Sequence, residues 1–384
     1  MYISRLNCSV KKTLKIKSVL LLGPRRTGKT QYINNELKPD RVYNLLTHND
    51  FLRLSSNPGL IGEELQKKDK LIVIDEIQKL PSLMDEIHNL IESSDIHFLL
   101  TGSSARKLRR SYTSLMAGRA RVERLLPFTS CELRSFDKKI FDIDKILNFG
   151  SLPPVYLSEN PELELEDYAG IYLKEEIQAE AIVRKIENFS RFLTVAALSN
   201  SELINFTQIS RDAQMPQRTV VEYFNILRDT LIGDMVEPFK SEKNRKSYSM
   251  CKFYFFDVGV ANYLASNFKI QKKSVAYGKA FEHFIYTELR AYKIYKNKRE
   301  PLQFWRDYAG HEVDFIIGDK LAIEVKSAEM VNKKHFKGIN AFSKKSAVKR
   351  KIIISFDTNK RKVKDIEIIP VMEFLNELWS DKIW

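Results

Sequence analysis

The sequence predicts an α/β protein whose first domain is a parallel sheet flanked by helices, and two stretches support this prediction. In residues 18–30, an apolar run leads into Gly-Pro-Arg-Arg-Thr-Gly-Lys-Thr and then into a helix-compatible segment. In residues 70–76, four consecutive apolar residues end in two acids. A short, continuous apolar run of this kind is typical of a strand that is buried on both faces of a parallel sheet.

The first stretch has the spacing of a phosphate-binding loop, Gly-x-x-x-x-Gly-Lys-Thr, between a strand and a helix. Its two glycines allow the backbone to turn, so that consecutive N–H groups and the positive end of the helix face an anion. We expect Lys29 to reach the β- and γ-phosphates of ATP, and the Thr30 hydroxyl to hold Mg²⁺. The predicted nucleotide-binding residues are Gly23, Pro24, Arg25, Arg26, Thr27, Gly28, Lys29 and Thr30.

The two acids that end the second stretch, Asp75 and Glu76, lie where open α/β sheets bind their ligands, at the carboxyl ends of the strands. We expect Asp75 to hold Mg²⁺, directly or through water, and Glu76 to polarise the water that attacks the γ-phosphate. The alternative is a strand followed by solvated acids, and the phosphate loop upstream makes that alternative less favourable.

Two further candidates follow along the chain. A third apolar strand, predicted from residue 97 onward, ends in Thr101 and Ser103, whose hydroxyls can sense the γ-phosphate or, equally well, cap the next helix. Arg119 follows a glycine and is a candidate arginine finger, acting in cis or in trans within a homo-oligomer. Its alternative is an ordinary surface arginine.

The length of the chain limits the number of domains, and its net charge limits the kind of partner. The 384 residues exceed one typical core, and we place domains at 1–160, 161–271 and 272–384. Lysine and arginine number 63 against 49 acids, a net charge of +14, which favours nucleic acid as the partner, with DNA ahead of RNA. The alternative is a solvated basic surface.

The cysteines and the hydropathy of the chain indicate the cellular compartment in which we expect the protein. The three cysteines are far apart and odd in number, which suits a reducing cytoplasm and predicts no disulfide framework. No apolar run approaches membrane-spanning length, so we expect a cytoplasmic protein without a membrane partner.

The middle of the chain predicts helices over residues 160–200, then two helices joined by a tight turn at Pro216, which suits the first turn of a helix. This is helix-turn-helix spacing. Residues 238–256 predict a hairpin with Lys243, Arg245 and Lys246 at its tip. Together these elements predict a winged helix with a basic wing, and the alternative is a winged helix used for packing or protein contacts.

In the last third, apolar residues alternate over 313–317 and over 321–325. Both sets share one face only if Ile317 pairs with Leu321, which sets Asp314 opposite Glu324. Opposed carboxylates repel each other unless a cation lies between them, and Mg²⁺ or Mn²⁺ suits their oxygen ligands.

The predicted metal ligands are therefore Asp314 and Glu324. We expect Lys326, on the same face, to stabilise charge on a phosphate, and Glu282 to complete the site from a helix. The alternative is a degenerate domain that only binds or scaffolds.

Taken in order, the chain resembles the AAA+-type ATPases of bacteria and archaea whose C-terminal part is related to restriction-endonuclease-like PD-(D/E)xK nucleases. The resemblance departs from the family at residues 149–151, where the family more often has two glycines before its Phe/Leu-Pro step. The resemblance covers nearly the whole chain. The motifs that support it are GPRRTGKT, LIVIDEIQ, LLTGSS, AGR followed by LLPF and Glu132, FGSLP, KFYFFDVGV, the helix start at 278–282, residues 305–314, and AIEVKS.

The resemblance implies a P-loop ATPase domain, a helical and winged-helix domain, and an α/β restriction-endonuclease-like domain. We therefore expect a protein that binds and hydrolyses ATP with Mg²⁺ and acts on nucleic acid, with metal-dependent nuclease activity in the last domain left open. The alternative is an NTP-driven switch or scaffold with an inactive nuclease-like domain and a protein partner.

Overall fold

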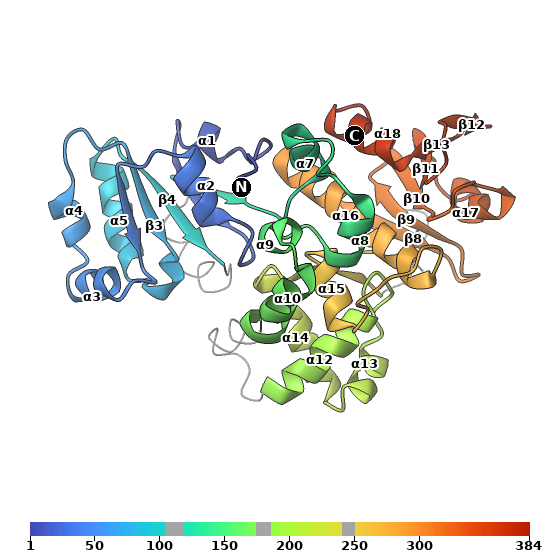
Figure 1. Cartoon of the computed structure of the whole chain (residues 1–384), viewed down its shortest axis with the longest axis horizontal. Coiled ribbons are helices and arrows are strands. Elements are labelled where there is room, and N and C mark those ends of the chain that lie inside the picture. Colours follow the sequence, from blue (N-terminus) through green and yellow to red (C-terminus); the bar gives the residue numbers. More distant parts are fainter. Residues whose placement is uncertain (104–117, 174–185, 240–249) are drawn as a thin grey trace. The chain divides into compact units, whose positions relative to one another are not determined.

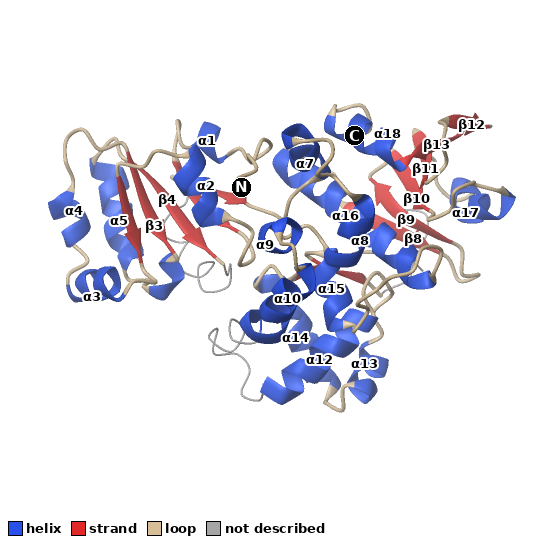
Figure 2. Ribbon diagram, in the orientation of Figure 1, coloured by secondary structure: helices blue, strands red, loops and turns tan. Residues whose placement is uncertain are grey.

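The computed structural model describes residues 1–103, 118–173, 186–239 and 250–384 (Figures 1 and 2). The chain forms two compact units, the first made of residues 1–128 with 229–232, and the second of residues 129–228 with 233–384. This partition differs from the three predicted domains. The reason is helix α16 (Val275–Tyr295), which begins the predicted third domain but packs against α8 (Ile143–Phe149) and α15 (Val258–Leu264) from earlier parts of the chain.

The first unit is built on a five-stranded, all-parallel sheet in the order β2-β3-β4-β1-β5, so the predicted α/β class with a parallel sheet is confirmed for this part. The strands are β1 (Ser18–Leu22), β2 (Arg41–Asn44), β3 (Leu71–Asp75), β4 (His97–Gly102) and β5 (Ala120–Arg124). The helices are α1 (Val10–Thr13), α2 (Lys29–Glu36), α3 (His48–Ser56), α4 (Leu60–Glu64), the 3-10 turn η1 (Ile77–Lys79) and α5 (Leu83–Ser93).

Helices cover both faces of this sheet, which explains the unbroken apolar runs in its central strands. Leu20, Ile72 and Phe98 point into one cluster, which also contains side chains of α5. Val19 and Val73 point into a second cluster, which contains side chains of α1 and α2. In Figure 1 these strands run between α5 and the α1–α2 pair. The layered arrangement brings the carboxyl ends of β1, β3 and β4 to one edge.

The second unit begins with short helices and continues into a helix pair and a two-stranded antiparallel sheet. Helices α13 and α14 flank Pro216, as predicted, and the predicted hairpin tip with Lys243, Arg245 and Lys246 lies outside the described residues. The described elements are α7 (Ser130–Phe136), α8, α9 (Pro153–Leu157), α10 (Pro161–Leu165), the π-helical turn η2 (Glu166–Tyr172), α12 (Ile186–Leu198), α13 (Phe206–Asp212), α14 (Gln217–Asp229), β6 (Gly233–Val236), β7 (Lys252–Phe255) and α15.

Aromatic rings join these elements into a core. Phe192 of α12 contacts Phe224 of α14 edge-to-face with ring centroids 5.0 Å apart, and Phe224 contacts Phe253 of β7 at the same distance. Such pairs stabilise a core beyond the area they bury. This core fixes β7 against the helix pair and thereby sets the position of Lys252, the first residue of the strand.

The rest of the second unit is a mixed six-stranded sheet in the order β12-β13-β11-β10-β9-β8. Strand β10 pairs with β9 so that Leu321 lies opposite Ile317 and Ile323 opposite Phe315, which confirms the register read from the apolar alternation. The elements are α16, β8 (Leu302–Arg306), β9 (Glu312–Ile317), β10 (Leu321–Val325), the 3-10 turn η3 (Lys333–Phe336), α17 (Lys337–Ser343), β11 (Arg350–Ser355), β12 (Arg361–Val363), β13 (Ile366–Pro370) and α18 (Val371–Trp379).

Both faces of β9 and β10 are covered, so the apolar alternation that sets their register does not mark one buried and one exposed face. Helix α17 packs on the side of Ile316 and Ala322, while α16 contacts β10 and α18 contacts β11. All of β10 and all of β9 after its first residue are buried. The predicted acids therefore lie inside the unit.

Among the helices that the structure describes, none combines the length and the apolar character needed to span a membrane.

Candidate functional site

The predicted phosphate-binding loop lies between β1 and α2, where the strand ends and the helix begins. Gly28 has a φ of 91°, a left-handed conformation that favours glycine. Gly23 is required for a different reason than the predicted turn, because a Cβ atom there would lie 2.3 Å from the Leu125 carbonyl oxygen. Close approach of the segment after β5 therefore explains the first glycine, and backbone conformation explains the second.

Lys29, the predicted phosphate ligand, is folded inside the loop. Its Nζ atom donates to the carbonyl oxygens of Gly23, at 2.7 Å, and Pro24, at 3.2 Å. The side chain is almost fully buried, so the loop's own carbonyls stabilise its ammonium. The cation thus lies within the loop, as the assigned role requires.

Asp75, at the end of β3, accepts hydrogen bonds from two predicted site residues. The Thr30 hydroxyl donates to Asp75 Oδ2 at 3.3 Å, and the Thr101 hydroxyl, at the end of β4, donates to Oδ1. The Thr101 oxygen also accepts the backbone N–H of Glu76 at 3.0 Å. The ends of β3 and β4 and the start of α2 therefore bring together the side chains of Thr30, Asp75 and Thr101 and the backbone of Glu76. A hydroxyl and a carboxylate at this separation suit Mg²⁺, which binds oxygen ligands.

Glu76 is held by a residue that the sequence analysis missed. Its backbone is left-handed, with a φ of 61°, an uncommon conformation for a residue with a side chain. The Gln78 side-chain amide donates both to the Glu76 carboxylate and, at 3.2 Å, to the hydroxyl of Ser103. Within the described part of the chain, the buried Gln78 Oε1 atom has no hydrogen-bond partner. A glutamine two residues after the second acid was the available signal.

Arg119 lies at the other end of the sheet. It directly precedes Ala120, which pairs with Ser18 at the start of β1, and the parallel pairing puts the phosphate loop beyond the opposite end of that strand. Its guanidinium forms an ion pair with Glu92, near the end of α5. Since a five-residue strand is roughly 16 Å long, the predicted action in cis is wrong. An action in trans stays a prediction.

In the second unit, the structure brings together the predicted acids and the predicted lysine. The Asp314 carboxylate accepts the backbone N–H of Val325 at 2.7 Å. Lys326 Nζ lies 2.6 Å from Glu324 Oε1 and 3.9 Å from Asp314 Oδ2. We name Lys252, Tyr254, Glu282, Glu312, Asp314, Glu324 and Lys326 together the charge cluster.

Lys252, from the first position of β7, is the member of the charge cluster that the sequence analysis missed. Its Nζ atom lies 2.9 Å from Glu282 Oε1 and 4.0 Å from Asp314 Oδ1, and it forms an ion pair with Glu312. The Tyr254 hydroxyl donates to the same oxygen of Glu282 at 2.6 Å. Lys252 thus links the predicted helix acid to the predicted strand acids. A lone lysine at the head of an apolar strand was the only signal in the sequence.

The pKa shifts in the charge cluster follow from burial and from neighbouring charge. Burial, and then the charge of Asp314, raise the pKa of Glu324 well above its usual range. Burial also raises the pKa of Glu282, against the effect of Lys252. Although burial alone would lower them, the pKa values of Lys252 and Lys326 are raised by the surrounding carboxylates. The lysines therefore stay charged and compensate the acids.

The predicted metal ligands Asp314 and Glu324 face ammonium groups in the structure, and the metal site stays a prediction. Across the described ranges, no group of three or more His, Cys, Asp or Glu side chains is arranged to hold a metal ion. The cation that opposed carboxylates require is present as the ammonium groups of Lys252 and Lys326. The two lysines do not satisfy every carboxylate oxygen, since the buried Glu324 Oε2 atom has no hydrogen-bond partner among the described residues.

The turn at residues 149–151, where the chain departs from the family it resembles, has a structural partner. The Ser151 N–H donates to the Asp257 carboxylate at 2.8 Å, and Asp257 also caps α15 through the N–H of Val260. Burial raises the pKa of Asp257 to about 6. Two quoted motifs, FGSLP and KFYFFDVGV, therefore pack on each other inside the second unit.

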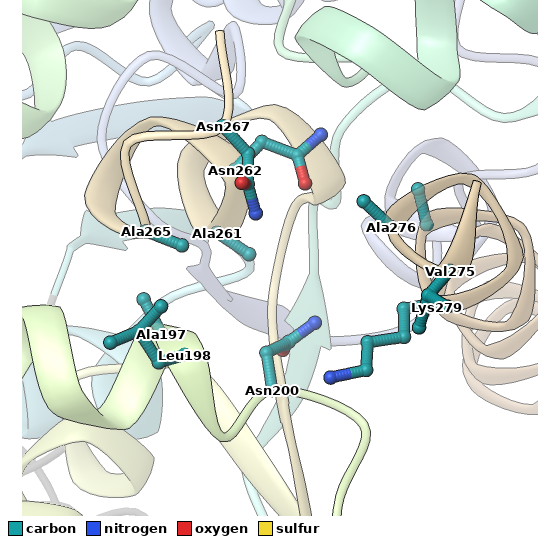
Figure 3. A pocket seen from close by; sticks show the side chains of 11 residues that line it. Ala197, Leu198, Asn200, Ala261, Asn262, Ala265, Asn267, Val275, Ala276 and Lys279 are labelled. Carbon is teal, nitrogen blue, oxygen red and sulfur yellow. The ribbon is translucent and has the colours of Figure 1, made fainter. Parts of the chain in front are cut away.

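A pocket in the second unit, with a volume of about 240 Å³, contains none of the predicted site residues (Figure 3). Asn200, Asn262, Asn267 and Lys279 line it among alanines. Structural contacts already engage several of these polar groups. Asn200 binds the backbone of Phe255, Asn262 binds the carbonyls of residues 147 and 148, and Lys279 pairs with Glu202.

Comparisons with known families divide the chain into three matched segments. Residues 15–134 match a family described as AAA domain. Residues 140–271 and 277–374 match two families, each described as a domain of unknown function (DUF8612 and DUF4143). The first match contains the phosphate loop, the acid pair and the strand hydroxyls.

The chain is also similar to several uncharacterized proteins. One, from Mycobacterium tuberculosis, is 23% identical over 308 residues, covering 78% of this chain and 67% of that protein. Two from Methanocaldococcus jannaschii are 24% and 25% identical, over 80% and 81% of this chain and 73% and 76% of their own lengths.

A solved structure, the Aeropyrum pernix Orc1 protein in complex with DNA, is 13% identical. The similarity covers 70% of this chain and 93% of that one with a TM-score of 0.29, and at that score it carries no argument. The AAA match and the geometry of the first unit concern the same residues. Within residues 15–134, which match the AAA domain, the side chains of the sequence motifs lie together at the carboxyl edge of a parallel sheet.

Proposed function

We propose that the protein binds and hydrolyses ATP at the edge of the first sheet. The observation that supports this most directly is the hydrogen-bonded set of Thr30, Asp75 and Thr101 beside the phosphate loop. Lys29 would neutralise charge on the β- and γ-phosphates, and Thr30 and Asp75 would hold Mg²⁺, which would stabilise the negative charge of the phosphates. Glu76 accepts a proton from the attacking water, in the orientation that its bond with Gln78 imposes.

The substitution Lys29→Ala tests this proposal, with Lys38→Ala as the control because Lys38 is an exposed lysine just beyond the end of α2. Loss of the buried cation should lower ATP hydrolysis by about 100-fold or more, as removing a donor to developing charge does in other active sites. The control should keep the wild-type rate. Equal rates in wild type and Lys29→Ala would remove Lys29 from the mechanism.

We further propose that nucleic acid, with DNA ahead of RNA, is the partner. The net charge of +14 supports this, as does the exposed Arg218, near the start of the second helix of the α13–α14 pair. The logarithm of the binding constant for duplex DNA should fall linearly with the logarithm of salt concentration, by about 0.9 per neutralised phosphate. Arg218→Glu should reduce this slope, whereas the charge-matched reversal Lys12→Glu, in the first unit, should not.

For the last part of the chain, one observation favours the alternative of a nuclease-like domain without cleavage, namely the two buried lysines among its acids. We propose that the charge cluster stabilises the second unit and that ATP, not metal-dependent cleavage, drives the protein. Labelled DNA and RNA should stay intact with ATP and Mg²⁺ or Mn²⁺. Cleavage that is lost in both Glu324→Ala and Lys326→Ala would overturn this proposal and restore a hydrolytic role for these residues with Glu282 and Asp314.

A further inference from the structure

The segment that leaves the first unit, residues 125–128, lies directly against the phosphate loop; we call it the connector. The Leu125 N–H donates to the Leu22 carbonyl at 2.8 Å, at the point where β1 passes into the loop. The Leu125 carbonyl is so close to Gly23 that no side chain fits between them. The chain enters the second unit immediately afterwards, at Thr129.

One arginine near the start of the chain binds both the loop and the connector. Arg5 Nη1 donates to the carbonyl of Thr27, in the loop, at 2.8 Å. Its Nη2 donates to the carbonyl of Leu126 and, at 3.4 Å, to that of Pro127, and its guanidinium carbon lies 5.2 Å from the centre of the Phe128 ring. Arg5 is only 3% exposed, so its charge depends on these acceptors.

The position of Arg5 is itself fixed to the helix that follows the loop. Its backbone N–H donates to Glu36 Oε1 at 2.7 Å, and the hydroxyls of Tyr2 and Ser4 donate to the same oxygen at 2.7 and 2.8 Å. These donors keep the pKa of Glu36 below its ordinary value, against the effect of burial. Residues 2–5 are therefore bonded to the last residue of α2, while the Arg5 side chain reaches Thr27 in the phosphate loop.

The other end of the connector is fastened within the second unit. Thr129 caps α7 through the N–H of Glu132, and Ser130 donates its N–H and its hydroxyl to the buried Glu288 of α16, at 2.8 and 2.7 Å. The four residues of the connector thus run between two anchors. Arg5 and Gly23 hold the first anchor, and Glu288 holds the second.

We propose that Arg5 is a positioning residue that couples the nucleotide state of the phosphate loop to the connector. The guanidinium is planar and presents its donors in a fixed fork, so the carbonyls of Thr27 and Leu126 keep a fixed mutual direction. A shift of Thr27 when phosphates bind therefore moves Leu126 or breaks a hydrogen bond of a buried charge. By linkage, the state of the connector changes nucleotide affinity by the same factor.

This inference rests on the proposed nucleotide binding, and hydrogen exchange on the full-length protein, with and without ADP or a non-hydrolysable ATP analogue, tests the two separately. In the wild type, nucleotide should slow amide exchange both in residues 23–30 and in residues 125–133. Arg5→Gln should bind nucleotide within about threefold of the wild-type affinity and keep the protection of the loop, but lose the protection of the connector. The conservative Arg5→Lys should restore part of it, and it replaces Arg5→Gln if that variant does not fold.

Arg41→Gln is the matched control, because Arg41 is also paired in the first unit, with Asp69 at 2.7 Å, but lies on the edge strand β2 away from the loop. It should keep both protections. Full connector protection in Arg5→Gln would overturn the coupling role. Loop protection without connector protection in the wild type would overturn the coupling and leave nucleotide binding intact, whereas no nucleotide binding by calorimetry would overturn the proposed function itself.

Discussion

The phosphate site of the first unit and the charge cluster of the second use the same kinds of side chain at the ends of strands, but in opposite electrostatic arrangements. In the phosphate site, Asp75 and Glu76 accept hydrogen bonds from neutral groups, the hydroxyls of Thr30 and Thr101 and the amide of Gln78. In the charge cluster, Glu282 and Glu324 each contact an ammonium group at less than 3 Å.

The difference decides which site suits an added cation. Neutral donors orient a carboxylate but do not cancel its charge, which is the arrangement expected of residues that are proposed to hold Mg²⁺. Lysines cancel that charge inside the protein, and separating such a buried pair leaves an uncompensated ion. Acids at metal-like spacing are therefore not by themselves a metal site, because the sequence does not show which cation faces them.

Removing the ammonium group of Lys252 should have the largest effect. Lys252→Met should lower the free energy of unfolding by about 3–5 kcal/mol, since it leaves the buried Asp314 and the half-buried Glu282 and Glu312 without their common partner. Lys273→Met, which breaks an exposed pair with Glu329, should cost less than about 1 kcal/mol. Denaturant unfolding of both variants measures the difference.

The variant Lys252→Met also tests whether the lysine takes the place of a metal ion in the charge cluster. If Lys252 takes the place of a cation, Mn²⁺ should raise the midpoint of thermal unfolding of Lys252→Met but not that of the wild type. Equal stability of Lys252→Met and Lys273→Met would show that the charge cluster is not held by Lys252.

In the phosphate site, Glu76→Gln should lower the rate of ATP hydrolysis by about 100-fold, the lower range for loss of a general base, because an amide accepts no proton from water. Binding of ATP should stay within a few-fold of the wild type, since Asp75 and Lys29 remain. Glu63→Gln, at an exposed acid of α4, provides the control. Calorimetry for binding and steady-state phosphate release for turnover separate the two effects, and a wild-type rate in Glu76→Gln would exclude it as the base.

A buried neutral group beside the charge cluster should make stability depend on pH. Burial lowers the pKa of His283 to about 4, and the partners fix its neutral form, since Asn200 donates to Nδ1 and Nε2 donates to the Phe255 carbonyl. The unfolded chain therefore binds more protons below about pH 6.5, so this contribution is complete above that pH and is lost as pH falls towards 4.

The loss between pH 7 and pH 5 should be about 2 kcal/mol from this group. His283→Gln should flatten the pH dependence of unfolding over that range, whereas the exposed His48→Gln should leave it unchanged. Parallel curves for wild type and His283→Gln would mean that His283 is not the titrating group.

The last prediction tests whether the phosphate site is complete within one chain. If Arg119 acts in trans, turnover per protomer should rise with protein concentration, and Arg119→Ala should reduce that rise without loss of ATP binding. Arg121→Ala, two residues further along the chain and within β5, is the control. Turnover that does not change with concentration, in a protein that stays monomeric by ultracentrifugation, would exclude the trans role.

The sequence alone determined features that depend on neighbours along the chain or on strict periodicity. The phosphate loop follows from spacing between a strand and a helix, and the pairing of Ile317 with Leu321 follows because a one-residue slip exchanges the two faces of a strand. Asp314, Glu324 and Lys326 come together for the same reason. These inferences needed no knowledge of distant segments.

The tertiary structure decided what faces those residues. Lys252 reaches the acids from a strand about 60 residues earlier (Asp314 to Lys252), Arg5 reaches the loop and the connector from the first turn of chain, and parallel pairing carries Arg119 to the far end of the sheet. Local sequence patterns predict which side chains share a face of a strand or helix. The cation or carbonyl that pairs with a buried charged group comes from a segment that can be distant in the sequence and is brought there by tertiary packing. Because the energy of a buried charge depends on that partner, the fold and not the motif decides which cation or donor each acid faces.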